Sequence, residues 1–507
     1  MDRVKSGYRK ARLWTDSLIL VFLLVIGSGW SEARAPQSQA NAAGDARTAE
    51  DQKAPADQKT AVAPGNPKPE RKISAKDAEA LFLEVDQILK FASKDTAFPI
   101  KHEVKRHLAS REEVSAYLEK SLREDKDAKR LRRTELVLKK FGLLPRDFDF
   151  EKSIVALLRE QVAGYYDQKT KTMNLLDWVP AEQQRPVLAH ELTHALQDQS
   201  FALGKWLKRN SEDLDKKKDI TAADIEKDEA DETLEAVVEG QAEAVMVDYL
   251  LEPTGRAVWN APEVLAELDA DMLKGDPDSV VFKKAPIFLK ESLTFPYRYG
   301  VQFVAAMGQE GGKAKAFAGL FRNPPHTTRQ IMEPKTYLSE ERIEPLEVPN
   351  LREIFKNYER FDVGSMGEFD VSMLIDQYAG PEVSRTLYPH WRGGYYYAAR
   401  PKGDASAPLG LLYVSRWSSA EKAARFAGVY AQSIAKRYQQ VQTVGEDGAK
   451  SAASLEKLQA WEGVRQWMTE EGAVVVEIEG DKVLVTESLD PATTARLSHD
   501  VFAVGTD

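Results

Sequence analysis

Apolar residues recur every three or four positions through much of the chain, which is the pattern of amphipathic helices packed on a core. This recurrence dominates residues 73–385, where proline-rich breaks separate one periodic stretch from the next. We therefore expect this segment to be mainly helical, with a helical N-terminal part over residues 73–141. Individual helices are predicted over residues 78–91, 112–141, 153–162, 187–196 and 231–251, and the region 252–380 is expected to be mostly helical.

Short runs rich in β-branched and aromatic residues predict strands in two places. Residues 164–167 and 171–176, separated by a Gln-Lys-Thr turn, predict a β-hairpin and hence a small β-sheet in the helical segment. After Trp391 the signals follow the order ββαβββα, which indicates a small α+β domain over residues 386–507. Its strands are predicted at 395–399, 411–416, 463–468, 473–479 and 482–487, and its helices at 419–438 and 491–501. The expected fold class is α+β.

The first 72 residues differ in composition from the rest. Five basic residues between Arg3 and Arg12 precede a short apolar run, residues 18–26, and then small residues. This layout is typical of a secretory signal, which we place at residues 1–35. The apolar run is short for a membrane span, so we expect export to the periplasm or outside the cell, with an uncleaved anchor as the alternative. Residues 36–72 lack large apolar residues and predict a disordered linker.

Charge and cysteine content exclude several classes of protein and site. The 507 residues carry a formal charge of −10 and include no cysteine. An acidic chain without a basic patch is a poor candidate for binding nucleic acid. The lack of cysteine excludes disulfides and thiolate-bound metals.

The pentapeptide His-Glu-Leu-Thr-His, residues 190–194, lies on the pattern of a buried helix. Residues four apart on a helix lie one above the other, so His190 and His194 can bind one tetrahedral Zn²⁺. Glu191 can then take a proton from a metal-activated water. With seven histidines in the chain, this pattern is expected by chance only about 0.01 times. Buried histidines and a glutamate would be costly here unless they coordinate an ion.

A zinc site with two histidines needs a third protein ligand and an open position for water. A third histidine six residues after His194 is excluded because that position is Ser200. The other common ligand is a glutamate from a later helix. Glu235, Glu239 and Glu243 form one stripe along the next long helix, and a solvated face is the alternative explanation of that stripe.

The zinc motif followed by Glu239-Gly-Gln-Ala resembles the gluzincin metallopeptidases. The segments 164–167, 295–300, 324–334 and 393–396 extend the resemblance to a group of largely uncharacterised, exported bacterial proteins related to gluzincins. Val238 stands where the gluzincin motif has Asn. The resemblance implies a zincin-like fold, hydrolysis of peptide bonds in a protein or peptide substrate, and Glu239 as third zinc ligand, with Glu243 and Glu235 as the other possibilities.

Further residues are candidates for a role at this site, and packing is the alternative for each. Asp198, one turn beyond His194, is expected to orient that imidazole or to be a solvated residue near the helix end. Residues 173–176 are expected to form the sheet edge that binds an extended substrate, or else a core strand. The candidates to stabilise an oxyanion or contact the substrate are Tyr165, Tyr166, Tyr297, Tyr299 and His326. The remaining histidines are expected to be structural: His102, His107, His390 and His499.

The leading hypothesis is an exported zinc metallopeptidase in which His190, His194 and Glu239 hold Zn²⁺ and Glu191 is the general base. One alternative is a non-catalytic cell-envelope assembly or binding protein with structural zinc on the same scaffold. Another is a zinc hydrolase that acts on a non-peptide bond. The presence of Glu191 is an argument against a purely structural zinc site, because such a site does not require that carboxylate.

Overall fold

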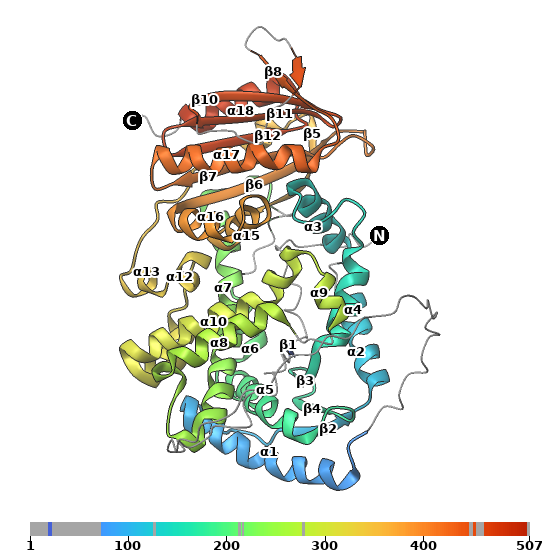
Figure 1. Cartoon of the computed structure of the whole chain (residues 1–507), viewed down its shortest axis with the longest axis vertical. Coiled ribbons are helices and arrows are strands. Elements are labelled where there is room, and N and C mark those ends of the chain that lie inside the picture. Colours follow the sequence, from blue (N-terminus) through green and yellow to red (C-terminus); the bar gives the residue numbers. More distant parts are fainter. Residues whose placement is uncertain are drawn as a thin grey trace, which may run out of the picture.

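The computed structural model describes residues 19–22, 72–124, 128–210, 214, 217–275, 279–445, 450–452 and 461–503. The described chain is α+β, as expected, with helices around a small sheet in one half and a large antiparallel sheet in the other (Figure 1). The expected signal segment, residues 1–35, lies outside the described residues except for 19–22. The expected linker, residues 36–72, also lies outside them except for Lys72.

The helical half is built from amphipathic helices whose apolar faces share one core. The predicted helix over 112–141 is divided into α2 and α3, and the one predicted over 231–251 is the end of a longer helix, α7. That helix begins at Ala222 because Thr221 and Asp224 form a capping box there. The longer helices are α1 (Ala75–Thr96), α2 (Arg111–Glu124), α3 (Ala128–Phe141), α4 (Phe150–Gln161), α5 (Ala181–Phe201), α7 (Ala222–Leu251), α8 (Pro262–Lys274) and α10 (Ile287–Ala314). The short ones are α6 (Leu203–Trp206), η2 (Glu252–Thr254), η3 (Val258–Asn260), α9 (Val280–Lys284), the π-helical turn η4 (Lys315–Gly319), α11 (Leu320–Arg322), α12 (Thr328–Met332) and α13 (Pro334–Leu338).

A four-stranded sheet in the order β1-β3-β4-β2 lies beside α5. β1 (Ile19–Phe22) and β4 (Thr172–Leu176) each pair antiparallel with β3 (Val162–Asp167), and β2 (Lys105–Ala109) pairs parallel with β4. The predicted hairpin is confirmed as β3 and β4, whereas no strand was expected at β2. The expectation that residues 173–176 form the sheet edge is wrong, because β4 has a neighbouring strand on both sides.

The large sheet has the order β5-β6-β7-β12-β11-β10-β8-β9, and all of its described pairings are antiparallel. α17 (Ala420–Arg437) packs on one face, and α14 (Leu351–Ile354) and α18 (Pro491–Ala503) pack on the other. The predicted strands and helices after Trp391 are confirmed, but β5, β8 and β9 were not expected. The strands are β5 (Tyr358–Ser365), β6 (Trp391–Pro401), β7 (Gly410–Trp417), β8 (Val441–Val444), β9 (Lys450–Ala452), β10 (Gly463–Thr469), β11 (Gly472–Glu479) and β12 (Lys482–Glu487), and the remaining helices are α15 (Glu368–Ala379), α16 (Pro381–Leu387) and η5 (Tyr388–His390).

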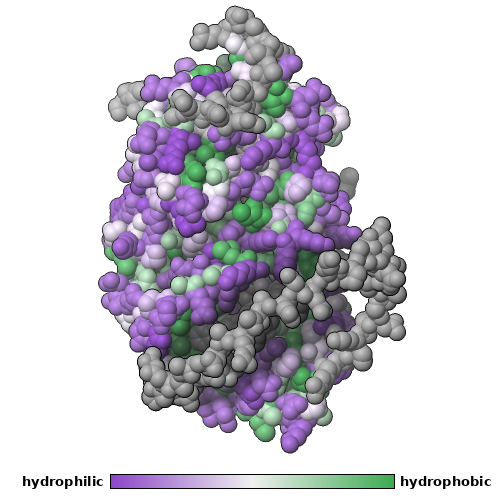
Figure 2. Space-filling view, in the orientation of Figure 1, coloured by the Kyte–Doolittle hydropathy of each residue, from purple (hydrophilic) through white to green (hydrophobic). Residues whose placement is uncertain are grey.

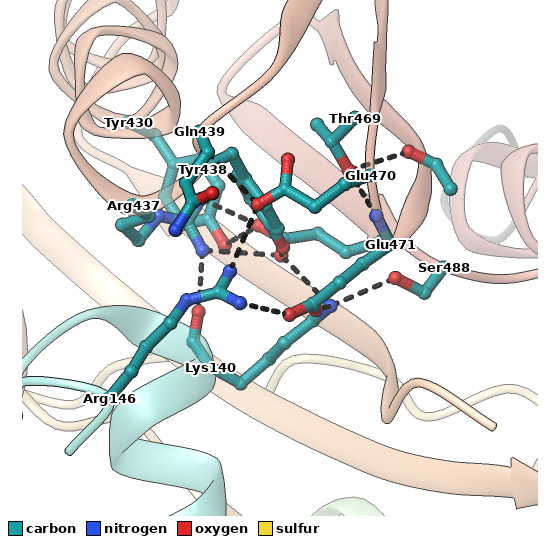
Figure 3. Close-up of polar contacts among 12 residues, drawn as sticks. Lys140, Arg146, Tyr430, Arg437, Tyr438, Gln439, Thr469, Glu470, Glu471 and Ser488 are labelled. Atoms are coloured by element: carbon teal, nitrogen blue, oxygen red, sulfur yellow. Dashed lines mark hydrogen bonds and ion pairs between the residues drawn. The ribbon is translucent and has the colours of Figure 1, made fainter. Parts of the chain in front are cut away.

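A buried ion-pair network joins α3 to the large sheet. The fully buried carboxylate of Glu487 on β12 accepts hydrogen bonds of 2.7 and 3.2 Å from Arg437, 2.7 Å from Tyr430 and 2.6 Å from Tyr438. Nζ of Lys140, at the end of α3, lies 3.7 Å from the same carboxylate, and Figure 3 shows Lys140 reaching into the cluster. Burial alone would raise the pKa of Glu487, but Arg437 and Lys140 outweigh it and lower that pKa to about 2.

The face of the described chain that Figure 2 draws is largely polar. Figure 2 shows hydrophilic residues over most of one face, with hydrophobic residues gathered in small separate areas. Within the described ranges, each helix is too short or too polar to cross a lipid bilayer.

Candidate metal centre

α5 carries His190, Glu191 and His194 through the interior of the helical half. Residues 187–197 are all buried, because α5 packs against α1, α7 and β3. The helix predicted over 187–196 begins earlier, at position 181, so Pro186 lies in its second turn. The spacing of the two histidines, one helical turn apart, brings both imidazoles to the side of α5 that faces α7.

The two imidazoles meet one carboxylate of α7. Oε2 of Glu239 lies 3.1 Å from Nε2 of His190 and 3.3 Å from Nε2 of His194. The ligand atoms of the three side chains all lie within 4.8 Å of one another. Two ligand bonds of about 2.05 Å at a tetrahedral angle would place their donor atoms about 3.3 Å apart. The two separations from Glu239 therefore match those of ligands that share one small cation.

Several buried polar atoms at this point have no hydrogen-bond partner among the described residues, and they include Nε2 of His194 and Oε1 of Glu191. An unpaired buried polar atom costs about 1–3 kcal/mol, so its retention calls for an explanation. A divalent cation bound at Nε2 of His194, with a water beside Glu191, would satisfy both atoms. The residues present thus fit a metal ion with an open coordination position.

The electrostatics of the cluster favour positive charge at the same point. Burial opposes ionisation of Glu239, but His194 and His190 outweigh it and lower the pKa of Glu239 to about 2. Burial also opposes protonation of His190, yet Glu239 and Glu243 raise the pKa of His190 to about 10. For Glu191 burial dominates and raises the pKa of the carboxyl to about 7. A bound cation would supply the charge that these carboxylates stabilise.

The three glutamates of the α7 stripe have different surroundings. Only Glu239 reaches Nε2 of both histidines. Oε2 of Glu243, one turn later, lies 3.4 Å from Nδ1 of His190, so this carboxylate is placed to orient the imidazole from its other side. Glu235, one turn earlier, lines a separate small cavity beside α10. A solvated face is the wrong explanation for Glu239 and Glu243, which are 7% and 2% exposed.

His194 is oriented by a residue that the sequence analysis did not single out. Its Nδ1 lies 2.9 Å from Oε1 of the fully buried Gln197. Asp198 was expected in this role, but its carboxylate pairs instead with Lys171 and with the hydroxyl of Tyr166. The position three residues after His194 faces α7, whereas the fourth turns toward the β3–β4 hairpin. The local sequence contains no signal for Gln197, because this residue begins the polar run Gln-Asp-Gln-Ser at residues 197–200.

Tyr297 of α10 is the oxyanion candidate that the structure brings to the cluster. Its ring stacks on His190, with 6.0 Å between ring centres. Burial, reinforced by the charges of Glu239 and Glu191, holds the pKa of Tyr297 well above its ordinary value, so the hydroxyl stays protonated. Tyr166 contributes its main chain instead of its hydroxyl, because its N–H donates a 2.7 Å hydrogen bond to Oε2 of Glu191.

Two other tyrosine candidates are engaged in packing. Tyr165 stacks on Tyr117 of α2, with 4.6 Å between ring centres. Tyr299 packs against Phe295 and lies under the guanidinium of Arg298. Neither residue is part of the group that could hold a metal.

The structure does not bring His326 to the metal cluster. This residue lies in an exposed loop before α12, where it lines a cavity of about 650 Å³ together with Glu226 of α7. Glu226 precedes Glu239 by thirteen residues, which corresponds to about 20 Å along a helix. The remaining histidines also lie apart from the cluster, at or near the surface: His102, His107, His390 and His499.

Comparisons with models of protein families, with curated proteins and with solved structures find no match for this chain. The site itself offers two imidazoles and a carboxylate that could hold one metal ion, and the buried carboxylate of Glu191 lies close enough to feel their charges. These are the components of metal-assisted hydrolysis.

Proposed function

We propose that this protein is an exported, zinc-dependent metallopeptidase of the gluzincin type with a zincin-like fold. The observation that carries the proposal is the meeting of His190, His194 and Glu239 at ligand distances, with Oε1 of Glu191 unpaired beside them. Two imidazoles and one carboxylate, leaving one position for water, are the donor set of many catalytic zinc sites. Peptide-bond hydrolysis is proposed because the spacing of the motif and of Glu239 resembles gluzincins.

Glu191 would act first as general base and then as proton carrier. A bound zinc ion supplies Lewis acidity, which lowers the pKa of water towards neutrality and polarises the scissile carbonyl. The N–H of Tyr166 holds Oε2 of Glu191, leaving Oε1 to accept the proton of the attacking water. The same carboxyl would then deliver that proton to the leaving amine. Burial, which disfavours the charged carboxylate, helps Glu191 to hold the proton between the two steps.

Tyr297 would stabilise the negative charge that develops on the carbonyl oxygen. Its hydroxyl is protonated and lies in a buried site, where a hydrogen bond to an oxyanion is stronger than in water. The stacking of its ring on His190 fixes the distance between this donor and the ligand set.

The side of β3 that β1 occupies, away from β4, is the proposed binding place for the substrate backbone once the expected signal segment that contains β1 has been removed. β1 pairs antiparallel with this edge, with Ile19 opposite Tyr166 and Leu20 opposite Tyr165, so the edge accepts an extended chain. A peptide substrate bound in the same manner would run past Glu191, because Tyr166 is hydrogen-bonded to that carboxylate.

The decisive experiment compares the purified wild-type protein with the Glu191→Gln variant. Bound zinc is measured by elemental analysis, and hydrolysis is measured with casein and with quenched fluorescent peptides. We expect equal zinc content and at least a 100-fold lower rate for the variant, as for removal of a general base. Glu182→Gln, an exposed position on the same helix, is the matched control and should leave both quantities unchanged.

Two results would contradict the proposal. Peptide hydrolysis that is equally fast in Glu191→Gln and in the wild type would remove the general base from the mechanism. A zinc-loaded wild type that cleaves no peptide would instead favour a protein in which zinc is structural.

A further inference from the structure

Two buried glutamines connect the metal cluster by hydrogen bonds to a turn that is distant in the sequence. Gln197 on α5 and Gln241 on α7 both have no exposed surface. Nε2 of Gln197 donates hydrogen bonds of 3.0 Å to the main-chain oxygen of Val238 and to Oε1 of Gln241. Oε1 of Gln197 lies 2.9 Å from Nδ1 of His194. A chain of side-chain hydrogen bonds therefore runs from His194 through Gln197 to Gln241.

The direction of these hydrogen bonds is dictated by a main-chain carbonyl. The oxygen of Val238 can only accept, so the atom of Gln197 that faces it must be the amide nitrogen. Oε1 of Gln197 then faces His194, and since this oxygen also only accepts, Nδ1 of His194 must carry a proton. A neutral imidazole carries one proton, so Nε2 keeps its lone pair and directs it toward Glu239.

The far end of this series of hydrogen bonds, at Gln241, is held in the same way. Nε2 of Gln241 donates hydrogen bonds of 2.8 and 3.0 Å to the main-chain oxygens of Ala316 and Phe317. Both oxygens belong to η4, the π-helical turn that follows α10. Such turns are rare and occur often at functional sites. Here the turn presents two adjacent carbonyls to one amide, so Gln241 cannot reverse its orientation without losing both hydrogen bonds.

We propose that Gln197 and Gln241 are positioning residues that hold His194 in the tautomer with a free Nε2 and thereby set the affinity of the site for zinc. This inference rests on the proposed metal centre but not on the hydrolysis of peptides. Outer partners of metal-bound imidazoles commonly fix the tautomer and ring orientation in this way.

A neutral amide suits this position better than a carboxylate. His190 already lies 3.1 Å from Glu239 and 3.4 Å from Glu243, so the buried cluster holds two nearby carboxylates. A further negative charge behind His194 would add repulsion in this buried site. An apolar pair of similar size would fill the space without desolvating two amides, so packing alone does not explain why both residues are glutamine.

The test measures zinc affinity by competition with a chromophoric chelator. Gln197→Met keeps the side-chain volume but removes the acceptor, and we expect it to weaken zinc binding by about 10–100-fold. Gln241→Met leaves Gln197 its hydrogen bond to Val238, so the expected loss is smaller, below about tenfold.

The matched control is Gln184→Met, on the same helix. Gln184 is also fully buried, but it hydrogen-bonds to the main chain of Leu176 and Val179 and not to a histidine. We expect this variant to unfold at a lower temperature while it binds zinc as tightly as the wild type. It therefore separates the loss of a buried amide from the loss of the partner of His194.

A spectroscopic measurement tests the tautomer directly. In zinc-loaded protein labelled with ¹⁵N at its seven histidines, long-range ¹H–¹⁵N correlation identifies which ring nitrogen of His194 carries the proton. We expect Nδ1 to carry it, with a hydrogen-bonded signal that is lost in Gln197→Met.

The inference is overturned if that proton lies on Nε2, or if Gln197→Met binds zinc as tightly as the wild type. It is also overturned if Gln184→Met weakens zinc binding as much as Gln197→Met. A protein that shows the expected tautomer and zinc affinities but cleaves no peptide would refute the proposed peptidase and leave this inference standing.

Discussion

The main-chain nitrogen of Tyr166 donates a 2.7 Å hydrogen bond to Oε2 of Glu191, which ties β3 directly to the carboxylate proposed as general base. The same strand pairs with β1 along the edge proposed for substrate binding. The position of the base and the position of the substrate backbone therefore depend on one strand. Small displacements of β3 should change catalysis more than they change metal binding.

Gly164 offers a way to test this dependence. A Cβ atom at this position would lie 3.0 Å from the side chain of Val187 on α5, which is a tight contact. The larger side chain of Gly164→Val should push β3 away from α5 and lengthen the hydrogen bond between Tyr166 and Glu191. We expect kcat/KM for a quenched peptide to fall by about 10–100-fold, with zinc content unchanged. Gly164→Ala should show a smaller fall, and equal rates for all three proteins would contradict the prediction.

The third metal ligand can be identified by single substitutions along the α7 stripe. Glu239→Ala should abolish zinc retention after dialysis against a chelator, because only this carboxylate reaches Nε2 of both histidines. Glu243→Ala should weaken binding by about 10–100-fold, as expected for a residue behind a ligand. Glu235→Ala should retain a full equivalent of zinc. Retention by Glu239→Ala together with loss in either other variant would reassign the ligand.

The pairing of His190 with His194 could be predicted because it depends only on the period of a helix. The third ligand could not be chosen from periodicity alone, since Glu235, Glu239 and Glu243 share one stripe at equal spacing. The packing of α5 against α7 determines which of these glutamates reaches both histidines. That contact joins residues about fifty positions apart in the sequence.

Other features depended on long-range packing in the same way. A Cβ at Gly240 would lie 2.2 Å from the carbonyl carbon of Gly300, so α7 and α10 pack closely at a point that the local sequence does not reveal. β5 lies in a segment expected to be mostly helical, and it is a strand because β6 pairs with it. Local pattern could not distinguish Gln197 from Asp198 as the partner of His194, because both lie within one turn of it.

The network around Glu487 predicts that the large sheet and the helical half unfold together. Glu487→Gln would leave the buried cation of Arg437 without its carboxylate, and breaking a buried pair in this way costs about 3–5 kcal/mol. Lys140 would keep its 2.8 Å ion pair with Glu471. Thermal unfolding should show one transition at a clearly lower temperature than in the wild type. Asp500→Asn removes an ion pair at the surface and should cost less than about 1 kcal/mol. Equal shifts in the two variants would contradict the assignment.

A second buried acid, Asp248 on α7, predicts a dependence of stability on pH. Its Oδ1 accepts a 2.6 Å hydrogen bond from the main-chain nitrogen of Val258, while the side chain also faces Asp95 of α1, which pairs with Lys313 of α10 at 2.6 Å. Burial, and then the nearby charge of Asp95, raise the pKa of Asp248 from 3.8 to about 7. The folded protein therefore binds this proton more tightly than the unfolded chain does. As pH rises from about 4 to 7, the free energy of unfolding should fall by about 2–4 kcal/mol from this group, and the loss persists above pH 7.

Asp248→Asn should remove this dependence while keeping both hydrogen bonds. The amide oxygen can still accept from Val258, and the amide nitrogen can donate to Asp95, as the protonated acid does. We therefore expect the variant to unfold at a higher temperature than the wild type at pH 8, and at nearly the same temperature at pH 5. Thermal unfolding measured at both pH values checks this. A variant that is less stable than the wild type at pH 8 would mean that the carboxylate is charged and well accommodated in the folded protein.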